Sequence, residues 1–557
     1  MRTKILPLAL CIAIAACGGR EGPASTSATG GTMVVAFPSD AGTIFPPQVY
    51  ESLGAAIRDN IYDRLADMGD DLNTVGDKGF TPHLADSWDW SADSLSVAFH
   101  VNPRARWHDG QPVRANDVRF SYKIFSDPKV GASVSPEISN IDSVSVRDSL
   151  TAVVWYKEHH PQSFYDFVYQ IYIIPEHIFK DIAPDQLRTS EAARKGIGSG
   201  RFRLARWDAG QRIELVADTA NYRGRAKLDR VIWTIVPDAS ATLARLLGGQ
   251  ADFLEAVPPD QVHLIDSSKS VRSVPYPSLQ YVYMGFNLVD RKNPSRPHPI
   301  FGDVRVRRAL SMALDRRAML QNVFSGAGSI SYGPFPRGIS FADTTLALPP
   351  YDLNAAKALL DSAGWKEPSP GATRTKYGQP LRFSLLVPVS SRSRMAYAVL
   401  IQEALRKVGA QVDLDQVQAN VAGQREFKRD FDASLHGQFT DPSPSGYKQQ
   451  WGSGGVPPSG QNWFSYRNPS FDALLDSALG TADPSRMRAD MRHAFQIQIA
   501  DAPGVWLYDI PLIAGIHKRI RPQPMRPDGW WIHLADWTIP PNERIDRDRI
   551  GLGGTTP

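Results

Sequence analysis

Cysteine is scarce in this sequence. The chain has 557 residues but only two cysteines, Cys11 and Cys17. Two cysteines cannot build a disulfide-rich secreted scaffold, so the fold must be held together by buried apolar cores. Apolar residues make up 42% of the chain, which is enough for such cores. At roughly 150 residues per domain, we expect three or four domains.

The sequence also lacks an excess of one charge and a long hydrophobic run. Its 62 basic and 58 acidic residues nearly cancel. Binding to nucleic acid through its phosphates needs a basic surplus, so we expect no nucleic-acid partner. No stretch in the body of the chain approaches the roughly 18 apolar residues of a spanning helix. We therefore expect the body to lie outside the membrane.

Motifs of the common enzyme classes are missing as well. The sequence contains no G-x-x-x-x-G-K-[ST] phosphate loop and no H-E-x-x-H zinc motif. In the glycine-rich run 196–200, Gly198 occupies the position that serine takes in a nucleophile elbow. His159 and His160 are adjacent and point to different faces, so they make a poor metal pair. We expect a protein that is not an enzyme, with no catalytic residue, metal site or cofactor.

The first residues indicate export. Arg2 and Lys4 precede a mostly apolar run at 5–16, which leads through small residues to Cys17. This order is typical of a signal peptide, and the run is too short to span a membrane. Cys17 resembles the lipidated cysteine of a bacterial lipobox, so we expect 1–16 to be removed. A plain signal peptide with an incidental Cys17 is the alternative. Residues 17–31, rich in small and polar residues, predict a flexible tether.

Strand and helix patterns alternate in part along the body, which predicts a mixed α/β class. Residues 381–387 and 411–414 are apolar strand candidates, and they flank a helical pattern at 394–408. This order predicts a β-α-β unit with a parallel pair of strands. Asp303 and Asp352 precede two further helical patterns and are the predicted caps. Antiparallel hairpins are expected in the first third.

Six stretches of the chain together resemble the family 5 solute-binding proteins of ABC importers, the peptide/nickel-binding group. Each stretch alone is weak, but the similarity runs in order from about residue 33 to 520. The six stretches are 84–118 (from LADSW to WHDGQPV and NDV), 198–202 (GSGRF), 287–316 (with FGDVRVRRAL), 351–365 (from YD to AGW), 468–472 (NPSFD) and 503–508 (PGVWLY).

The resemblance implies a two-lobed periplasmic-binding-protein fold of α/β class (type II, cluster C), with an extra inserted domain. A ligand would be enclosed between the lobes as they close on a hinge. The implied division is lobe I at 32–75, 195–285 and 505–540, an inserted domain at 76–194, lobe II at 286–504, and a loose tail at 541–557.

The resemblance also implies a function. The protein would be a lipid-anchored receptor in the periplasm or at the cell surface, with a small solute, foremost an oligopeptide, as its ligand. Its partners would be an ABC permease and separate ATPase subunits, and we expect a monomer. An oligosaccharide or metal chelate is the alternative ligand. A secreted hydrolase and a non-transporting sensor or chaperone are the alternative functions.

Peptide-binding members pair the ammonium group of the ligand with an Asp in a D-x-x-[DE]-P run, and this chain departs from that pattern. Gln438 stands at the position of the Asp, whereas Asp441 is retained. An uncharged amide argues against a free peptide amine at Gln438, unless Asp441 turns inward or the register shifts by one residue. Packing of Gln438 in a loop is the alternative. Phe439, in the same run, is a further candidate for ligand contact. Trp451, Tyr283, Asn287 and Tyr508 are also candidates, each with core packing as the alternative.

Overall fold

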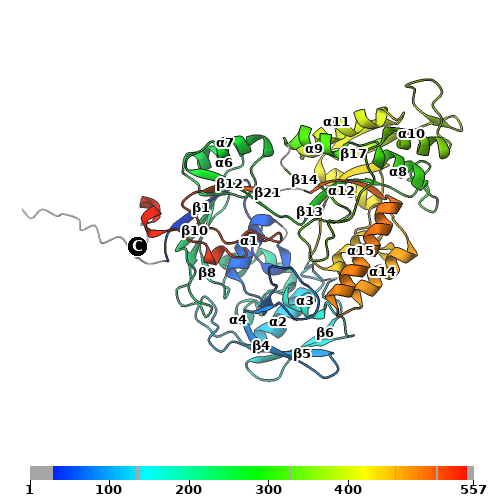
Figure 1. The fold of residues 1–557 in the computed structure, drawn as a ribbon. Coiled ribbons are helices and arrows are strands. Elements are labelled where there is room, and N and C mark those ends of the chain that lie inside the picture. The colour runs from blue at the N-terminus through cyan, green and yellow to red at the C-terminus, as the bar shows by residue number, and fades with distance from the viewer. Residues whose placement is uncertain are drawn as a thin grey trace, which may run out of the picture.

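The computed structural model has two lobes and a third, smaller domain. It describes residues 29–548, except for 50, 133, 136, 326–327, 458–459 and 510–511. Lobe I lies on the left of Figure 1, lobe II on the right, and the inserted domain below. Each of the three parts is built on its own β-sheet, of seven, six and four strands. The predicted signal peptide and Cys17 lie outside the described residues.

Lobe I is built on the seven-stranded sheet. The central strand β1 pairs in parallel with β10 and β11, and the outer strands pair antiparallel. Buried and partly exposed residues alternate along β9, because the two faces of the sheet differ in solvent access. The strand order is β12 (Val271–Tyr276), β21 (Leu512–His517), β11 (Phe253–Leu254), β1 (Thr32–Phe37), β10 (Arg230–Ile235), β9 (Arg212–Ala217) and β8 (Phe202–Asp208). Its helices are α1 (Ser52–Ile61), α6 (Ala239–Leu247) and α7 (Val262–Asp266).

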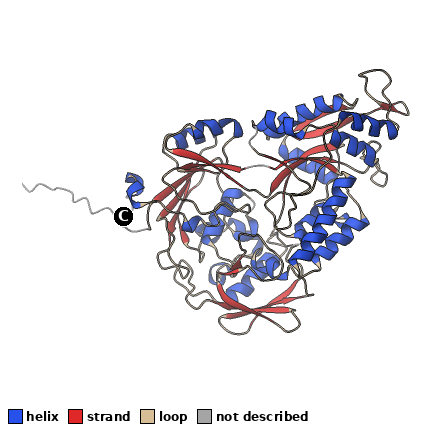
Figure 2. Cartoon of the chain, viewed as in Figure 1, coloured by secondary structure: helices blue, strands red, loops and turns tan. Residues whose placement is uncertain are grey.

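The inserted domain places an antiparallel sheet at the edge of the molecule. Its helices lie between this sheet and the rest of the protein, as Figure 2 shows in blue above the lower red strands. The sheet order is β4 (Ala85–Trp90), β5 (Ser96–Val101), β7 (Thr151–Tyr156) and β6 (Ile141–Val146). The helices are α2 (Ala115–Ser126), α3 (Ser163–Val168), α4 (Glu176–Phe179) and α5 (Glu191–Lys195), and a short pair β2 (Ala66–Asp67) and β3 (Thr81–Pro82) precedes the sheet.

Lobe II is built on the six-stranded sheet. Strands β17 and β18 pair in parallel around α11, which confirms the predicted β-α-β unit. The order is β14 (Ser329–Ile330), β20 (Gly504–Asp509), β13 (Gln280–Phe286), β19 (Ala433–Phe439), β17 (Arg382–Pro388) and β18 (Gln411–Val417). A small hairpin pairs β15 (Thr375–Lys376) with β16 (Gln379–Pro380). The helices are α8 (Val304–Met312), α9 (Arg316–Phe324), α10 (Leu353–Ser362), α11 (Arg392–Arg406), α12 (Ala419–Lys428), α13 (Pro444–Trp451), α14 (Pro469–Leu479) and α15 (Pro484–Asp501).

The helix starts in lobe II follow local chemistry. The carboxylate of Asp303 accepts a hydrogen bond from the backbone N–H of Arg305, and that of Asp352 accepts one from Ala355. Each bond satisfies an N–H group that has no partner within the first helical turn. Both predicted caps are confirmed. No helix among the described residues is long and apolar enough to cross a membrane.

The chain passes between the lobes on adjacent strands. Strand β12 belongs to the sheet of lobe I and β13 to that of lobe II, so the first crossing lies at 277–279. The return crossing lies between β20 and β21, which are likewise in different sheets. The predicted lobe boundaries at 285 and 505 therefore differ from the sheet membership. A run of buried aromatic and aliphatic residues predicts a strand, but it does not tell which sheet the strand joins.

The part of the predicted loose tail that ends at Asp548 is anchored to lobe I. The residue Asp548 is 3% exposed, and its carboxylate accepts a hydrogen bond from the backbone N–H of Thr32, at 2.7 Å. Arg519 bridges Asp548 and Asp252 with N–O distances of 2.7 Å to each. The end of the described chain is thus tied to the first strand through a buried ion network.

Candidate ligand-binding site

A cavity of about 500 Å³ lies where lobe I, the inserted domain and lobe II meet. This volume is within the range of roughly 300–1,000 Å³ that is usual for small-molecule sites. The first crossing between the lobes, at Ser278 and Leu279, forms part of the wall, which places the cavity in the interlobe cleft. Lobe I contributes Pro46, Glu51, Glu255, Tyr276, Trp530 and Trp531, the inserted domain Phe125, Val134, Tyr169 and Gln170, and lobe II Gln280 and Phe439.

Aromatic side chains from lobe I and from lobe II line this interlobe cavity. Trp530 packs against Phe253 with ring centroids 4.2 Å apart, and the indole N–H of Trp531 donates to Asp59 at 2.9 Å. These contacts hold both tryptophans in place. Phe439, at the end of β19, is instead 54% exposed. Covering an exposed phenyl ring with a ligand is favourable, because the apolar area of the ring is removed from water.

The carboxylates of the interlobe cavity outnumber their basic partners. Arg58 pairs with Asp59, and Arg526 pairs with Asp528, each at 2.8 Å. Among the described residues, Glu255 and Glu51 have no ion pair; the hydroxyl of Ser52 donates to Glu255 at 3.2 Å. Burial raises the pKa of Glu255 to about 7, although the Ser52 hydrogen bond opposes the shift. The cavity therefore presents to a ligand two carboxyl groups without a basic partner among the described residues, those of Glu51 and Glu255.

Glu255 predicts a pH-dependent stability of the ligand-free protein. Its pKa is raised from 4.5 to about 7 on folding, so between these values the folded chain holds a proton that the unfolded chain releases. Stability should therefore fall as pH rises through this window. We expect a loss of roughly 1–2 kcal/mol, reduced from the full shift by partial solvent access, and expect Glu255→Gln to remove it. Urea unfolding across the window measures the slope, and an equal slope in the variant contradicts this assignment.

Two of the seven predicted ligand residues lie at or beside the cavity. Phe439 lines it, and Asp441 follows two residues later. The carboxylate of Asp441 turns toward the inserted domain, where the hydroxyl of Tyr165 donates to its two oxygens at 3.0 Å each. Burial raises the pKa of Asp441 despite hydrogen bonds from Ser443, Tyr165 and Gln170. Gln170 lines the cavity itself, so Asp441 is one side chain removed from it.

Gln438 lies in β19, 6% exposed, with partners inside lobe II. Its amide N–H donates to the carbonyl of Phe439 at 2.7 Å, and its oxygen lies 3.2 Å from the imidazole of His436. His436 in turn bonds Glu426 at 2.9 Å. Burial disfavours ionisation of Glu426, but His436 and Ser434 outweigh it and lower the pKa of that carboxyl. Both ends of the Gln438 amide are thus used in a strand-bound network, and its contact with a ligand stays a prediction.

Tyr283 and Trp451 form the centre of an aromatic cluster in lobe II. Their ring centroids are 5.4 Å apart, and Tyr283 also packs against Trp506 at 5.2 Å. Trp451 is fully buried and donates its indole N–H to the hydroxyl of Tyr281 at 3.3 Å. Core packing, the alternative stated for both residues, accounts for every one of these contacts.

Asn287 and Tyr508 are also buried in lobe II. The amide of Asn287 donates to the carbonyls of Arg429 and Phe431, at 3.0 Å each, and so joins two segments of the lobe. Tyr508 packs against Phe324 with ring centroids 4.9 Å apart. The structure therefore brings only Phe439 and Asp441 of the seven candidates toward the interlobe cavity.

Sequence reasoning missed most of the residues that line this cavity. Trp530 and Trp531 follow Gly529 in a loop near the end of the chain, and Glu255 follows the short strand β11. None of these three residues belongs to a motif, and each reaches the cavity only through the assembled sheet of lobe I. The adjacent tryptophans were the available signal, because two large aromatic residues in an irregular segment must either be buried or contact a ligand.

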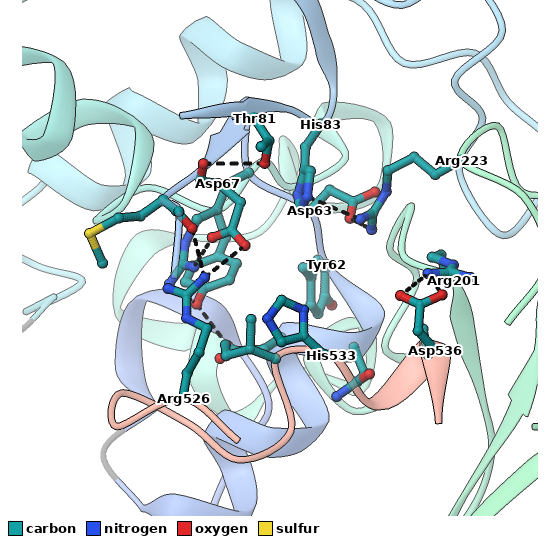
Figure 3. A pocket seen from close by; sticks show the side chains of 18 of the residues that line it. Tyr62, Asp63, Asp67, Thr81, His83, Arg201, Arg223, Arg526, His533 and Asp536 are labelled. Carbon is teal, nitrogen blue, oxygen red and sulfur yellow. Dashed lines mark hydrogen bonds and ion pairs between the residues drawn. The ribbon is translucent and has the colours of Figure 1, made fainter. Parts of the chain in front are cut away.

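A second cavity, of about 330 Å³, lies between lobe I and the inserted domain (Figure 3). Its charges are neutralised within the protein. Arg201 pairs with Asp536 at 2.9 Å, and Arg223 pairs with Asp63. The third labelled guanidinium, that of Arg526, is held by Asp528 and the carbonyl of Met68. Each arginine that lines this cavity has an acidic partner among the described residues, so we take the interlobe cavity as the candidate site.

In the described part of the chain, no group of three or more His, Cys, Asp or Glu side chains has the arrangement of a metal site.

The family of the chain follows from comparison with known proteins. A profile of the bacterial extracellular solute-binding proteins, family 5 middle, matches residues 79–457. Because this match covers more than half of the chain, the protein belongs to that family. Its members are binding proteins of transporters rather than enzymes, and they act in the periplasm or outside the cell.

Relatives with assigned roles match over most of their length. The chain is 27% identical to the oligopeptide-binding protein AppA of Bacillus subtilis over 526 residues, which covers 90% of this chain and 91% of AppA. It is 26% identical to the probable D,D-dipeptide-binding periplasmic protein DdpA of Escherichia coli, covering 88% and 90% of the two chains.

Solved structures confirm the predicted two-lobed α/β fold. The structure of Bacillus subtilis AppA in complex with a nonapeptide matches with a TM-score of 0.75 at 25% identity, over 92% of this chain and 99% of AppA. NikZ of Campylobacter jejuni in complex with Ni(L-His) matches with a TM-score of 0.74 at 21% identity, over 91% and 99%. The second match concerns the fold alone.

Proposed function

We propose that this protein is the lipid-anchored receptor of an ABC importer. It captures an oligopeptide in the interlobe cavity and passes it to a membrane permease that separate ATPase subunits drive. It works as a monomer, anchored through Cys17 in the periplasm or at the cell surface. Membership of the family and the peptide-binding roles of AppA and DdpA support the ligand class.

The interlobe cavity is the observation that carries this proposal. A peptide presents a polar backbone, varied side chains and a charged terminus, and the cavity offers complementary groups. The exposed ring of Phe439 and the fixed ring of Trp531 can cover apolar side chains. The hydroxyl of Tyr276 donates to the carbonyl of Glu255 at 3.1 Å, which places a polar pair on the same wall. Closure of the lobes would strengthen hydrogen bonds to the ligand by excluding water.

Native mass spectrometry on the protein purified without residues 1–17 tests the ligand class. We expect a co-purified mass that fragments as a ladder of amino-acid residues. A co-purified sugar or metal chelate would contradict the peptide assignment and support the alternative ligand. A protein that arrives empty is then titrated with a pool of pentapeptides, and the absence of any bound peptide contradicts the proposal. Turnover of the bound peptide would instead indicate a hydrolase.

The lipid anchor is tested by Cys17→Ser. The sulfur of Cys17 is the atom that would carry the lipid. A serine hydroxyl at the same position is not a substrate for that modification. We expect the wild type to incorporate labelled palmitate and to sediment with membranes, and the variant to do neither. As a control for expression and export, Cys11→Ser should behave as the wild type, because Cys11 lies inside the predicted signal. Equal membrane association of all three proteins would contradict the anchor.

A further inference from the structure

A segment of the inserted domain, residues 162–170, contacts both lobes. On the side of lobe II, the hydroxyl of Tyr165 donates to both carboxylate oxygens of Asp441, at 3.0 Å each. Two residues further along lobe II, the hydroxyl of Ser443 donates to the amide oxygen of Gln162 at 3.2 Å. These hydrogen bonds join α3, and the residue before it, to the loop that follows β19. Together they are called the α3 contact below.

The same segment is fixed to lobe I through Tyr169. The ring of Tyr169 stacks on that of Tyr165, with centroids 4.9 Å apart. From lobe I, the guanidinium of Arg64 lies 4.2 Å from the centroid of the Tyr169 ring, a favourable cation–π distance. The hydroxyl of Tyr169 donates to Asp528, also in lobe I, at 3.2 Å. Tyr165 is therefore held on the lobe I side, and its hydroxyl reaches across to lobe II.

The α3 contact is buried. Tyr165, Gln162 and Ser443 have no solvent-exposed area. Separating lobe II from the inserted domain would break both hydrogen bonds and return apolar area of the tyrosine ring to water, which is unfavourable. A hydrogen bond that a carboxylate accepts, like the one from Tyr165, is also among the stronger kinds. The α3 contact therefore stabilises the arrangement in which lobe II lies against the inserted domain.

The α3 contact adjoins the interlobe cavity on both of its sides. Tyr169 of the inserted domain lines the cavity, and so does Phe439, two residues before Asp441 in lobe II. Between these two residues of lobe II, the backbone N–H of Thr440 donates to the carbonyl of Leu279, at the first crossing between the lobes, with a distance of 2.8 Å. The loop of the α3 contact therefore follows directly on the segment that carries Phe439 to the cavity wall.

We propose that Tyr165 is a positioning residue that holds lobe II in the closed, ligand-binding arrangement. Through Asp441 it fixes the segment of Phe439 against the inserted domain, although Tyr165 itself does not line the cavity. This inference rests on the proposed function for the identity of the ligand, whereas the α3 contact acts on the protein with or without a ligand. It gives the inserted domain a part in ligand capture.

Distances between two spin labels test the role of Tyr165. Both cysteines of the chain lie within residues 1–17, so the protein purified without these residues has none, and labels attach only at introduced cysteines. Asp181→Cys places one label on the exposed surface of the inserted domain, and Lys428→Cys places the other on that of lobe II. Neither position lines the interlobe cavity.

Two tyrosine variants are compared in the labelled protein. Tyr165→Phe removes the hydroxyl from the α3 contact and keeps the ring that stacks on Tyr169. Tyr222→Phe is the matched control, because the hydroxyl of Tyr222 donates to Asp63 at 2.9 Å within lobe I. Both variants lose one hydrogen bond from a tyrosine to a carboxylate, but only the first loses it between domains.

Without ligand, we expect the wild type and Tyr222→Phe to share a population with a short distance between the labels. Tyr165→Phe should lower the ratio of short to long distances by about 3- to 30-fold, the effect of one hydrogen bond to a charged acceptor. A saturating amount of the tightest pentapeptide of the pool should restore the short distance in Tyr165→Phe, because the ligand shifts the population toward the arrangement it binds. A tyrosine with a structural role alone would lower the unfolding midpoint and leave these populations unchanged.

The outcomes separate this inference from the proposed function. Equal distance distributions in all three proteins overturn the role of Tyr165 and leave peptide binding intact. A wild type without a short-distance population, with and without peptide, overturns it as well. If no peptide binds, the proposed function fails, and the distances in the ligand-free proteins still decide on Tyr165. Should Tyr165→Phe fail to fold, Gln162→Leu replaces it in each comparison, because it removes the other hydrogen bond of the α3 contact and its side chain does not cap α3.

Discussion

Replacing Arg519 with methionine is expected to lower the free energy of unfolding by about 3–5 kcal/mol, because it strands buried carboxylates. The guanidinium is 3% exposed and contacts Asp252 and Asp548, whose side chains are fully buried. It also donates to the carbonyl of Thr32 in β1 at 2.7 Å. Arg547 still neutralises Asp252 in the variant, but Asp548 keeps no cation. Urea unfolding followed by circular dichroism measures the loss.

A surface arginine provides the matched control for Arg519. Arg406 pairs with Glu403 one helical turn away at 2.8 Å, and its side chain is 71% exposed. Exposed pairs of this kind contribute roughly 0–1 kcal/mol, so Arg406→Met should leave the stability almost unchanged. If both variants lose equally little, the network that anchors the chain end is not a stabilising element.

Replacing Gly198 with alanine is expected to destabilise the protein by about 3 kcal/mol or more, because the new methyl group has no room. A Cβ atom at this position would lie 2.0 Å from the carbonyl oxygen of Ile61. That oxygen belongs to the backbone and accepts a hydrogen bond from Gly200 at 2.7 Å, so it cannot move freely. His108 closes the same turn through its two ring nitrogens, which lie 3.2 Å from the N–H of Gly198 and 3.0 Å from the carbonyl of Gly200.

The control for Gly198 is a glycine with open space around it. Gly423 lies on the exposed face of α12, and a Cβ atom there would meet no other atom within 4 Å. Alanine at position 423 should stabilise the helix by about 0.5–1 kcal/mol, since it loses less backbone entropy on folding. The two substitutions should therefore shift the urea midpoint in opposite directions. A destabilisation by Gly198→Ala of less than about 1 kcal/mol would contradict the close packing at this turn.

The fold could be predicted well from this sequence because its local signals agree with its global arrangement. Asp303 and Asp352 cap helices where the pattern places them, and the β-α-β unit of lobe II forms around α11. Two of the stretches that resemble the family, at His108 and Gly198, contact each other in the structure. The sheet assignment of β13 and β20 could not be predicted, since it depends on pairing with distant strands.

The candidate site was much harder to predict. Trp451, Tyr283 and Tyr508 are of the residue types that often contact ligands. Aromatic residues also stabilise a core, by the same burial of apolar area. Trp531 and Glu255 reach the cavity only through the tertiary fold. Phe439 was recognised because it follows Gln438 in the run that resembles the anchor motif. Its exposed ring at the end of a strand then distinguishes it from the buried aromatic residues.

The measurement that tests the location of the site most directly compares two phenylalanine variants of lobe II. Phe439 is 54% exposed in the interlobe cavity, and Phe427 is 49% exposed on α12, where its ring packs against Trp463. Titration of each variant with the peptide identified by mass spectrometry, or with the tightest pentapeptide of the pool, gives the affinity. The two substitutions remove the same side chain at similar exposure, so the main difference between them is the position of the ring.

We predict that Phe439→Ala binds this peptide about 10- to 100-fold more weakly than the wild type, because a stacked aromatic ring is lost from the wall of the site. Phe427→Ala should bind with the affinity of the wild type. Equal affinities of both variants and the wild type, with all three proteins folded, would contradict the account by placing the peptide outside the interlobe cavity.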